Sequence, residues 1–362
     1  MRGTCRAALL VLASAHGVLA SGGEELVLDY SAEGRPFPAA GKIVVRCERG
    51  SVRVAGDPEA DRIYVRALEE ALGAAGEESR AILDATTIDI REEGDSLVRV
   101  EVSPSGARFS RKRSFLGRLF GSPENIEVAV ALSIRLPERA DVEVRTVRAS
   151  VRVTGIAGRV SVETASGAVR LDEIAGEVRA ATEAGSIGAE DITGPVDVRS
   201  VRGEIEVRRV TGPVRVEGAA GEMYVFAVAG PVEVKNISGE VVVARASGSL
   251  AVTTAGGPVE LIRCEGTIDV RTRAGGVTVR DVGKGLSRCR IRTESGEIRV
   301  LVPERWDARV EARAGTGAIE CVYPIDLKWI SKEGFLGVAG EGREELTIES
   351  RSGGVRIVRE KA

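Results

Sequence analysis

Glycine recurs at every ninth position through residues 158–275, which gives fourteen consecutive units of nine residues. In every unit the residues two and four positions after the glycine are apolar, as Val160 and Val162 are in the first unit. Apolar residues two apart indicate one buried face of a β-strand. The seventh position after the glycine is apolar in twelve units, with Glu183 and Arg273 as the exceptions, so it too is predicted to face inward.

One strand and turn of nine residues cannot bury its inward face alone, whereas stacked units share a continuous core. The repeat therefore predicts an all-β fold, a parallel β-solenoid. With two units per turn, the outward third positions alternate in charge: Arg179, Asp197, Arg215 and Glu233. With three units per turn, Glu206, Glu233 and Glu260 would stack, and like charges would repel. We therefore expect about two units, or eighteen residues, per turn.

The chain begins with a segment typical of a cleaved signal peptide, residues 1–20, with Arg2 and Arg6 before an apolar run that is too short to span a bilayer. We expect the protein to be exported, either to the periplasm or to the extracellular cell surface. Without that segment 49 basic residues stand against 54 acidic ones, a net charge of −5, so no basic field favours nucleic acid.

The rest of the chain is predicted to divide into three parts. Residues 21–140 form an irregular β-rich cap, which contains one short helix over 67–83 and a basic loop over 103–124. Residues 141–302 form the regular solenoid, and residues 303–362 form its C-terminal rungs and cap. The helix is predicted because leucine and isoleucine are spaced among glutamates there.

The basic loop combines cations with three phenylalanines and contains no acidic residue from Ser103 to Pro123. Its five cations are Arg108, Arg111, Lys112, Arg113 and Arg118. Basic and aromatic side chains together suit an anionic membrane surface or an acidic glycan. The alternative is a strand connection whose phenylalanines fold back on the core.

The chemistry open to the mature chain is restricted, because its one histidine, His16, lies in the predicted signal peptide. No C-x-x-C spacing suggests a metal site. We expect Cys47, Cys264, Cys289 and Cys321 to be buried free thiols, with a Cys264–Cys289 disulfide as the alternative. We predict no catalytic residue, no metal and no cofactor.

A second candidate site follows from the eighteen-residue turn. On the face opposite the alternating charges, the residues three and five positions after the glycine point outward. They are predicted to stack into an apolar patch: Tyr224, Phe226, Val242, Ala244 and Ile262. A water-facing apolar cluster is typical of a covered or partner-binding surface. We expect either that the predicted helix or the C-terminal segment covers it, or that it binds a partner or a second copy of the chain.

Three runs carry a family resemblance: LPERADVEVRTVRASVRVTGIAGRVSVETASGAVRL, SGEIRVLVPERWDARVEARAGTGAIECVYPI and GVAGEGREELTIESRSGGVRI. With them the chain resembles the bacterial putative-adhesin family of β-strand-repeat proteins, a domain of unknown function. The resemblance implies a β-solenoid at the cell envelope. Its motifs are structural repeats, so it implies no catalytic residue.

These observations favour a non-catalytic, adhesin-like binding module that contacts an envelope protein or a glycan. A structural or assembly element of the envelope is the first alternative. The second is a β-helix enzyme acting on polysaccharides, for which Glu190 and Glu206 would be the paired carboxylates. The aromatic content of 3% leaves few rings to stack on sugars, which disfavours that enzyme.

Overall fold

The computed structural model describes residues 13–14, 27–31, 35–72, 87–93, 96–103, 127–281 and 285–360. Every regular element in these residues is a β-strand, so the predicted all-β class is confirmed. No helix capable of spanning a membrane is found among them. The chain divides into two compact units, Met1–Ala175 and Gly176–Ala362.

The first unit mixes antiparallel and parallel strands. Its strands are β1 (Ala13–Ser14), β2 (Val27–Ser31), β3 (Arg35–Pro36), β4 (Lys42–Asp57), β5 (Arg62–Leu72), β6 (Thr87–Glu92), β7 (Leu97–Ser103), β8 (Glu127–Pro137), β9 (Asp141–Ile156), β10 (Val160–Ser166) and β11 (Val169–Ile174). Strand β5 runs antiparallel to β2, β3 and β8, and β6 runs antiparallel to β7. Parallel pairing joins β4 to β7, β8 and β9, and β9 to β10 and β11.

The predicted helix over 67–83 is wrong where the structure describes it, because residues 67–72 belong to β5. Ala67 pairs with Tyr30 on one side and with Leu132 on the other. A strand held between two others satisfies its backbone groups on both edges, which outweighs a weak helix preference. Residues 73–83, like most of the predicted signal peptide and residues 104–124 of the basic loop, lie outside the described residues.

The second unit contains the longest regular part of the repeat. Its strands are β12 (Val178–Ala184), β13 (Ile187–Thr193), β14 (Val196–Arg202), β15 (Ile205–Thr211), β16 (Val214–Ala220), β17 (Met223–Ala229), β18 (Val232–Asn236), β19 (Val241–Gly256), β20 (Val259–Ile262), β21 (Glu265–Ala274), β22 (Val277–Arg280), β23 (Leu286–Ser295), β24 (Ile298–Val302), β25 (Ala308–Ala314), β26 (Ile319–Cys321), β27 (Asp326–Ile330), β28 (Gly334–Ala339), β29 (Glu344–Ser350) and β30 (Val355–Arg359).

From β12 to β17, each strand pairs in parallel with the next strand but one, and paired residues lie eighteen positions apart, as Val178 and Val196 do. After residues 281–285 the offset grows: Val277 pairs with Ile298. The residues two and four positions after each glycine form the core, where Val196 is 2% exposed and Val198 is fully buried. The unit is therefore solenoid-like, with one continuous apolar interior.

The two strands of one turn bury different residues. In β13, β15 and β17 the seventh position after the glycine is buried, for example at Ile192 and Val210. In the alternate strands it faces solvent, where Val201 is 52% and Ile237 is 60% exposed. The prediction that this position faces inward is therefore wrong for every second nine-residue segment.

The backbone at the sixth position explains the difference. Asp191, Arg209 and Ala227 have positive φ angles of 55°, 50° and 57°, which bend the strand and turn the seventh residue inward. We call the half of each turn that contains such a residue a bent half-turn. In the others, the straight half-turns, normal strand alternation buries the sixth residue, which is a short polar one such as Thr182 or Asn236.

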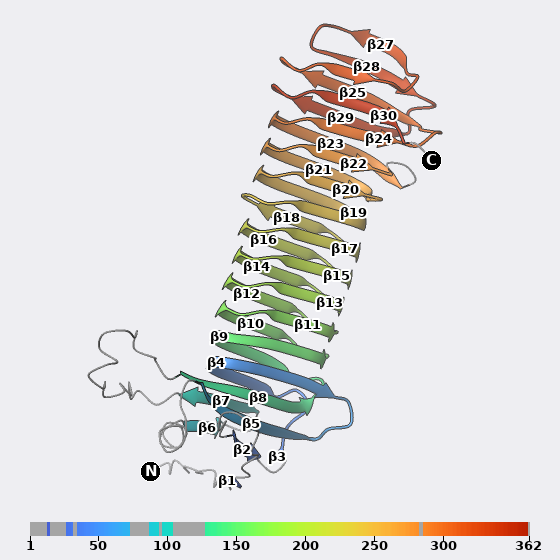
Figure 1. Cartoon of the computed structure of the whole chain (residues 1–362). Coiled ribbons are helices and arrows are strands. Elements are labelled where there is room, and N and C mark those ends of the chain that lie inside the picture. The colour runs from blue at the N-terminus through green and yellow to red at the C-terminus, as the bar shows by residue number, and fades with distance from the viewer. Residues whose placement is uncertain are drawn as a thin grey trace, which may run out of the picture. The chain divides into compact units, whose positions relative to one another are not determined.

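The order of strands along the chain differs from their order in the stack near the C-terminus. Strands β29 and β30 pair in parallel with β23 and β24 on one side. On their other side they pair with β25 and β26, which come earlier in the chain. Beyond β25, strands β28 and β27 continue the sheet in antiparallel order (Figure 1). The last turn of the chain thus lies between two earlier ones.

Candidate binding surface

The structure brings the five residues of the predicted patch together on bent half-turns, namely β17, the first half of β19, and β20. Tyr224 pairs in register with Val242, and Phe226 pairs with Ala244. Ala244 in turn pairs with Ile262. Consecutive strands in a sheet lie about 4.8 Å apart, so these side chains form two short adjacent columns.

Phe226 is the most prominent member of this apolar patch, and it is 37% exposed. The guanidinium of Arg245 lies over its ring, 5.2 Å from the centroid. The hydroxyl of Tyr224 donates a hydrogen bond to Glu222 at 2.7 Å, and the Glu222 carboxylate raises the pKa of Tyr224 to about 12. The Tyr224 ring is therefore held by its polar end at the rim of the patch.

Charged residues border the patch along the stack on both sides, and they pair with one another. Before the patch, Arg209 bonds to Asp191 and to Glu190. After it, Arg280 lies 2.7 Å from Glu260. The charges that border the apolar patch are therefore engaged with one another.

Arg245 differs from its neighbours, because no carboxylate pairs with it in the part of the chain that the structure describes. The corresponding residues two turns before it and one turn after it, Arg209 and Arg263, are paired with Asp191 and Asp281. An arginine over an aromatic ring keeps its N–H donors available at the ring's edge. Arg245 can therefore meet an acidic group of a partner at the patch.

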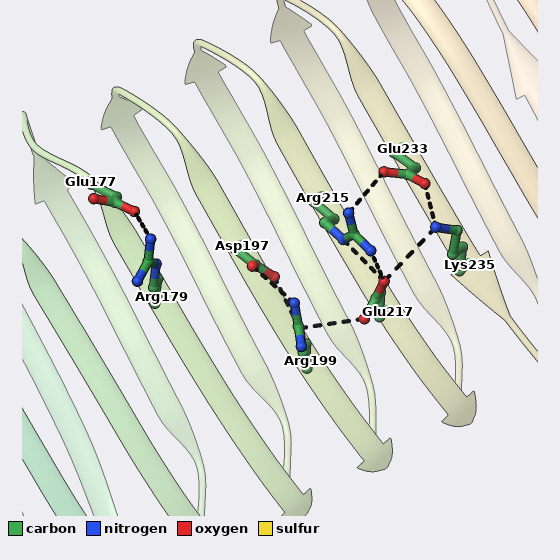
Figure 2. A network of polar contacts seen from close by, with 8 residues as sticks. All are labelled: Glu177, Arg179, Asp197, Arg199, Arg215, Glu217, Glu233 and Lys235. Atoms are coloured by element: carbon green, nitrogen blue, oxygen red, sulfur yellow. Dashed lines mark hydrogen bonds and ion pairs between the residues drawn. The ribbon is translucent and has the colours of Figure 1, made fainter.

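The straight half-turns carry a charge ladder that includes the alternating residues predicted from the sequence, Arg179, Asp197, Arg215 and Glu233. Its other residues are Glu177, Arg199, Glu217 and Lys235 (Figure 2). The contacts cross from turn to turn: Arg199 reaches Glu217 at 3.3 Å, and Arg215 reaches Glu233 at 3.4 Å. Four acids and four bases neutralise one another. Exposed pairs of this kind contribute at most about 1 kcal/mol each, so the ladder mainly favours the eighteen-residue register.

A shallow groove of about 420 Å³ lies beside the charge ladder. Its floor includes Pro195, Pro213 and Pro231, which follow the glycines of three successive straight half-turns. Proline has no N–H and cannot donate to a pairing strand, and here it immediately precedes each strand, where that donor is least needed. The charged residues that line this groove already pair with other side chains, and the groove is open to solvent. It therefore offers no group that would select a particular ligand.

The carboxylates weighed for an enzyme are engaged in ion pairs. Glu190 bonds to Arg209, and Glu206 bonds to Arg208. Among the described residues, no group of three or more histidine, cysteine, aspartate or glutamate side chains could hold a metal ion. Cys47, Cys264, Cys289 and Cys321 are free thiols; the first three are buried as predicted, whereas Cys321 is only half-buried. Burial raises the pKa of Cys47 to about 11. A protonated, buried thiol is a poor nucleophile.

Sequence reasoning missed two features of this surface. The first is the row of positive φ angles, which no glycine or asparagine marks at Ala227 or Arg245. The second is the stacking of Arg245 on Phe226, which needs the bend to bring the sixth residue of one turn over the fifth of the previous turn. The five cations of the basic loop lie outside the described residues.

Part of the second unit is similar to a known protein family. Residues 212–358 match the family model of the Toastrack domain, DUF4097. The expected resemblance to a repeat family of unknown function is confirmed. The Toastrack match covers the apolar patch and the C-terminal strands, and no curated protein matches the sequence.

Two solved structures are similar to the chain. One is a putative cell adhesion protein from Clostridium sporogenes ATCC 15579, 11% identical, aligned over 93% of this chain and 100% of its own, with a TM-score of 0.21. The other is a putative adhesin from Bacteroides fragilis NCTC 9343, 9% identical, aligned over 92% of this chain and 97% of its own, with a TM-score of 0.23. At such identities and TM-scores, neither carries an argument about function here.

Proposed function

We propose that this chain is an exported, non-catalytic, adhesin-like binding module of the bacterial cell envelope. In this proposal its solenoid consists of nine-residue units, two to each turn, and its apolar patch is the contact surface. The partner is an envelope protein or a glycan. The observation that carries the proposal is the patch itself, which is apolar and partly exposed on a surface where the neighbouring charges pair with one another.

The composition of the patch supports binding rather than chemistry. Aromatic rings with one available arginine are typical of the energetic centre of a binding interface. Tyr224 and Phe226 supply rigid contact area, while Arg245 supplies a donor for an acidic group. The paired border charges on both sides form a polar rim, as in interfaces that combine an apolar centre with a charged edge.

The test uses two matched double variants. Tyr224→Ser with Phe226→Ser removes both rings from the patch. Val201→Ser with Ile237→Ser removes two equally apolar, more exposed side chains from the straight half-turns. Binding is measured to an array of envelope glycans and purified surface proteins, and released reducing ends are measured in the same wells.

We expect the parent and the Val201/Ile237 control to be retained on the same array member without releasing reducing ends. The Tyr224/Phe226 variant should lose at least tenfold in affinity, because each truncated anchor residue typically costs about 2 kcal/mol. Both variants should unfold at nearly the parent temperature. Equal retention of all three proteins would show that the apolar patch is not the contact surface. Release of sugar by the parent would favour the polysaccharide-acting enzyme instead.

A further inference from the structure

The outermost strand of the antiparallel sheet at the end of the second unit has one unpaired edge. Strand β27 pairs antiparallel with β28, and β28 pairs with β25. Within the described residues no strand pairs with the other edge of β27, which is the last in this series (Figure 1). Such an edge presents backbone N–H and C=O groups that can pair with another strand.

The side chains of β27 make this edge unusual. All five of its residues are exposed, and Leu327, Trp329 and Ile330 are 55%, 49% and 69% exposed. The nearby Val322 is also 60% exposed. Elsewhere in the described residues of the second unit, large exposed apolar side chains occur singly in separate segments. Here several are concentrated in one short segment, which is typical of an interaction surface.

The two charges of β27 indicate the occupant. Asp326 and Lys328 have no ion-pair partner in the described part of the chain, although many other charged residues of this unit do. A bulge leaves Lys328 without a register partner in β28. If two copies pair antiparallel about Leu327, Asp326 of each lies opposite Lys328 of the other, and Ile325 lies opposite Trp329. Parallel pairing in register would set like charges against each other.

We propose that β27 pairs with β27 of a second copy of this chain, in antiparallel orientation centred on Leu327. The contact joins the end sheets of two second units into one continuous sheet. It places the apolar side chains of both copies next to one another and pairs two aspartates with two lysines. This inference does not depend on the apolar patch, which lies on other strands.

The experiment is a charge-swap series on the purified chain, followed by sedimentation velocity over a range of protein concentrations. Asp326→Lys and Lys328→Asp each set like charges opposite one another twice per dimer. The double variant Asp326→Lys with Lys328→Asp restores opposite charges. All three changes are on exposed side chains, so the melting temperature should stay near that of the parent.

We expect the parent to form a dimer, each single variant to dissociate with a constant about tenfold higher, and the double variant to recover the parent value. Acrylamide quenching gives a second readout. The chain has two tryptophans, and Trp306 is only 4% exposed, so quenching reports mainly on Trp329 and should fall as the dimer forms. A monomeric parent, a dimer unaffected by the single changes, or a double variant that fails to recover would each overturn the proposal.

Discussion

Arg209 donates two hydrogen bonds to the carboxylate of Asp191, the residue at the same position one turn earlier, at 2.6 and 2.8 Å. Both residues have positive φ angles, of 50° and 55°. The Arg209 guanidinium holds the pKa of Asp191 below its usual range. The bent half-turns are thus connected from turn to turn by side chains that begin at strained backbone positions.

Ala227 continues this column one turn later, with φ at 57° and no side-chain group to bond. We expect Ala227→Gly to raise the free energy of unfolding by about 0.5–1 kcal/mol, because relief of left-handed strain exceeds the entropic cost of glycine. Ala244→Gly, on an extended residue of the neighbouring column, should lower it by a similar amount. Urea unfolding checks both changes, and a loss of stability at Ala227 would contradict the strain assignment.

The buried polar residues of the straight half-turns provide a second matched pair. The hydroxyl of Thr254 donates to the carbonyl of Gly256 at 2.8 Å, whereas that of Thr182 is buried without a partner in the described residues. Thr254→Val should therefore cost about 1 kcal/mol, the net worth of one hydrogen bond. Thr182→Val should be neutral or stabilising by up to about 1 kcal/mol. Equal costs at the two sites, measured by thermal unfolding, would argue against this distinction.

Two substitutions test which side chains of the repeat point into the core. One is at a buried position, and the other is at a position that the sequence predicted to be buried but that is exposed. Val207 is fully buried, so Val207→Asp should prevent stable folding at neutral pH. Val201 is 52% exposed, so Val201→Asp should change the unfolding free energy by less than about 0.5 kcal/mol. Circular dichroism and melting temperature distinguish the two. A folded Val207→Asp variant would show that the register is wrong.

Glu344 introduces a pH dependence into the C-terminal strands. Burial raises the pKa of its carboxyl from 4.5 to about 7 in the folded state, so the folded protein binds a proton that the unfolded chain releases. This favours folding below about pH 4.5, and the benefit is lost as pH rises through about 7. The melting temperature of Glu344→Gln minus that of the parent should therefore increase as the pH rises from about 5 to about 8. Parallel pH profiles of the two proteins would exclude the effect.

The basic loop remains a proposal from the sequence, and vesicle sedimentation tests it. Replacing Arg111, Lys112 and Arg113 by Ser should abolish binding to anionic vesicles at low salt, since each cation near such a surface contributes about 1 kcal/mol. The melting temperature should not change. Parent binding that survives high salt, or equal binding by both proteins, would favour the alternative in which the loop only connects strands.

Much of the second unit could be predicted from the sequence because nearly every turn places apolar residues at the same inward positions. Apolar residues such as Val207 and Val225 recur at the same positions of successive units, which favours stacking in register, and the structure pairs these two residues directly. Alternating charges at the outward positions, as at Arg215 and Glu233, favour the same register. Local pattern and long-range pairing therefore agree through most of the repeat.

The remaining features depend on partners distant in sequence. Residues 67–72 resemble a helix locally and become a strand because β2 and β8 lie on either side of them. The seventh position has an apolar residue in both kinds of half-turn, so composition alone does not show that a backbone bend buries Val210 and leaves Val201 exposed. The exposure of Trp329 likewise follows from the position of β27 at the edge of the sheet.

The placement of β29 and β30 between two earlier turns affects how the chain can fold as it is made. Strands β25 and β26 emerge first, but the parallel neighbours that support them lie in residues 344–359. Until those residues have been synthesised, the most recently made turn can extend the stack only as far as β24. The regular turns can therefore assemble progressively from one end, whereas β25 and β26 gain their parallel neighbours only late, through long-range contacts.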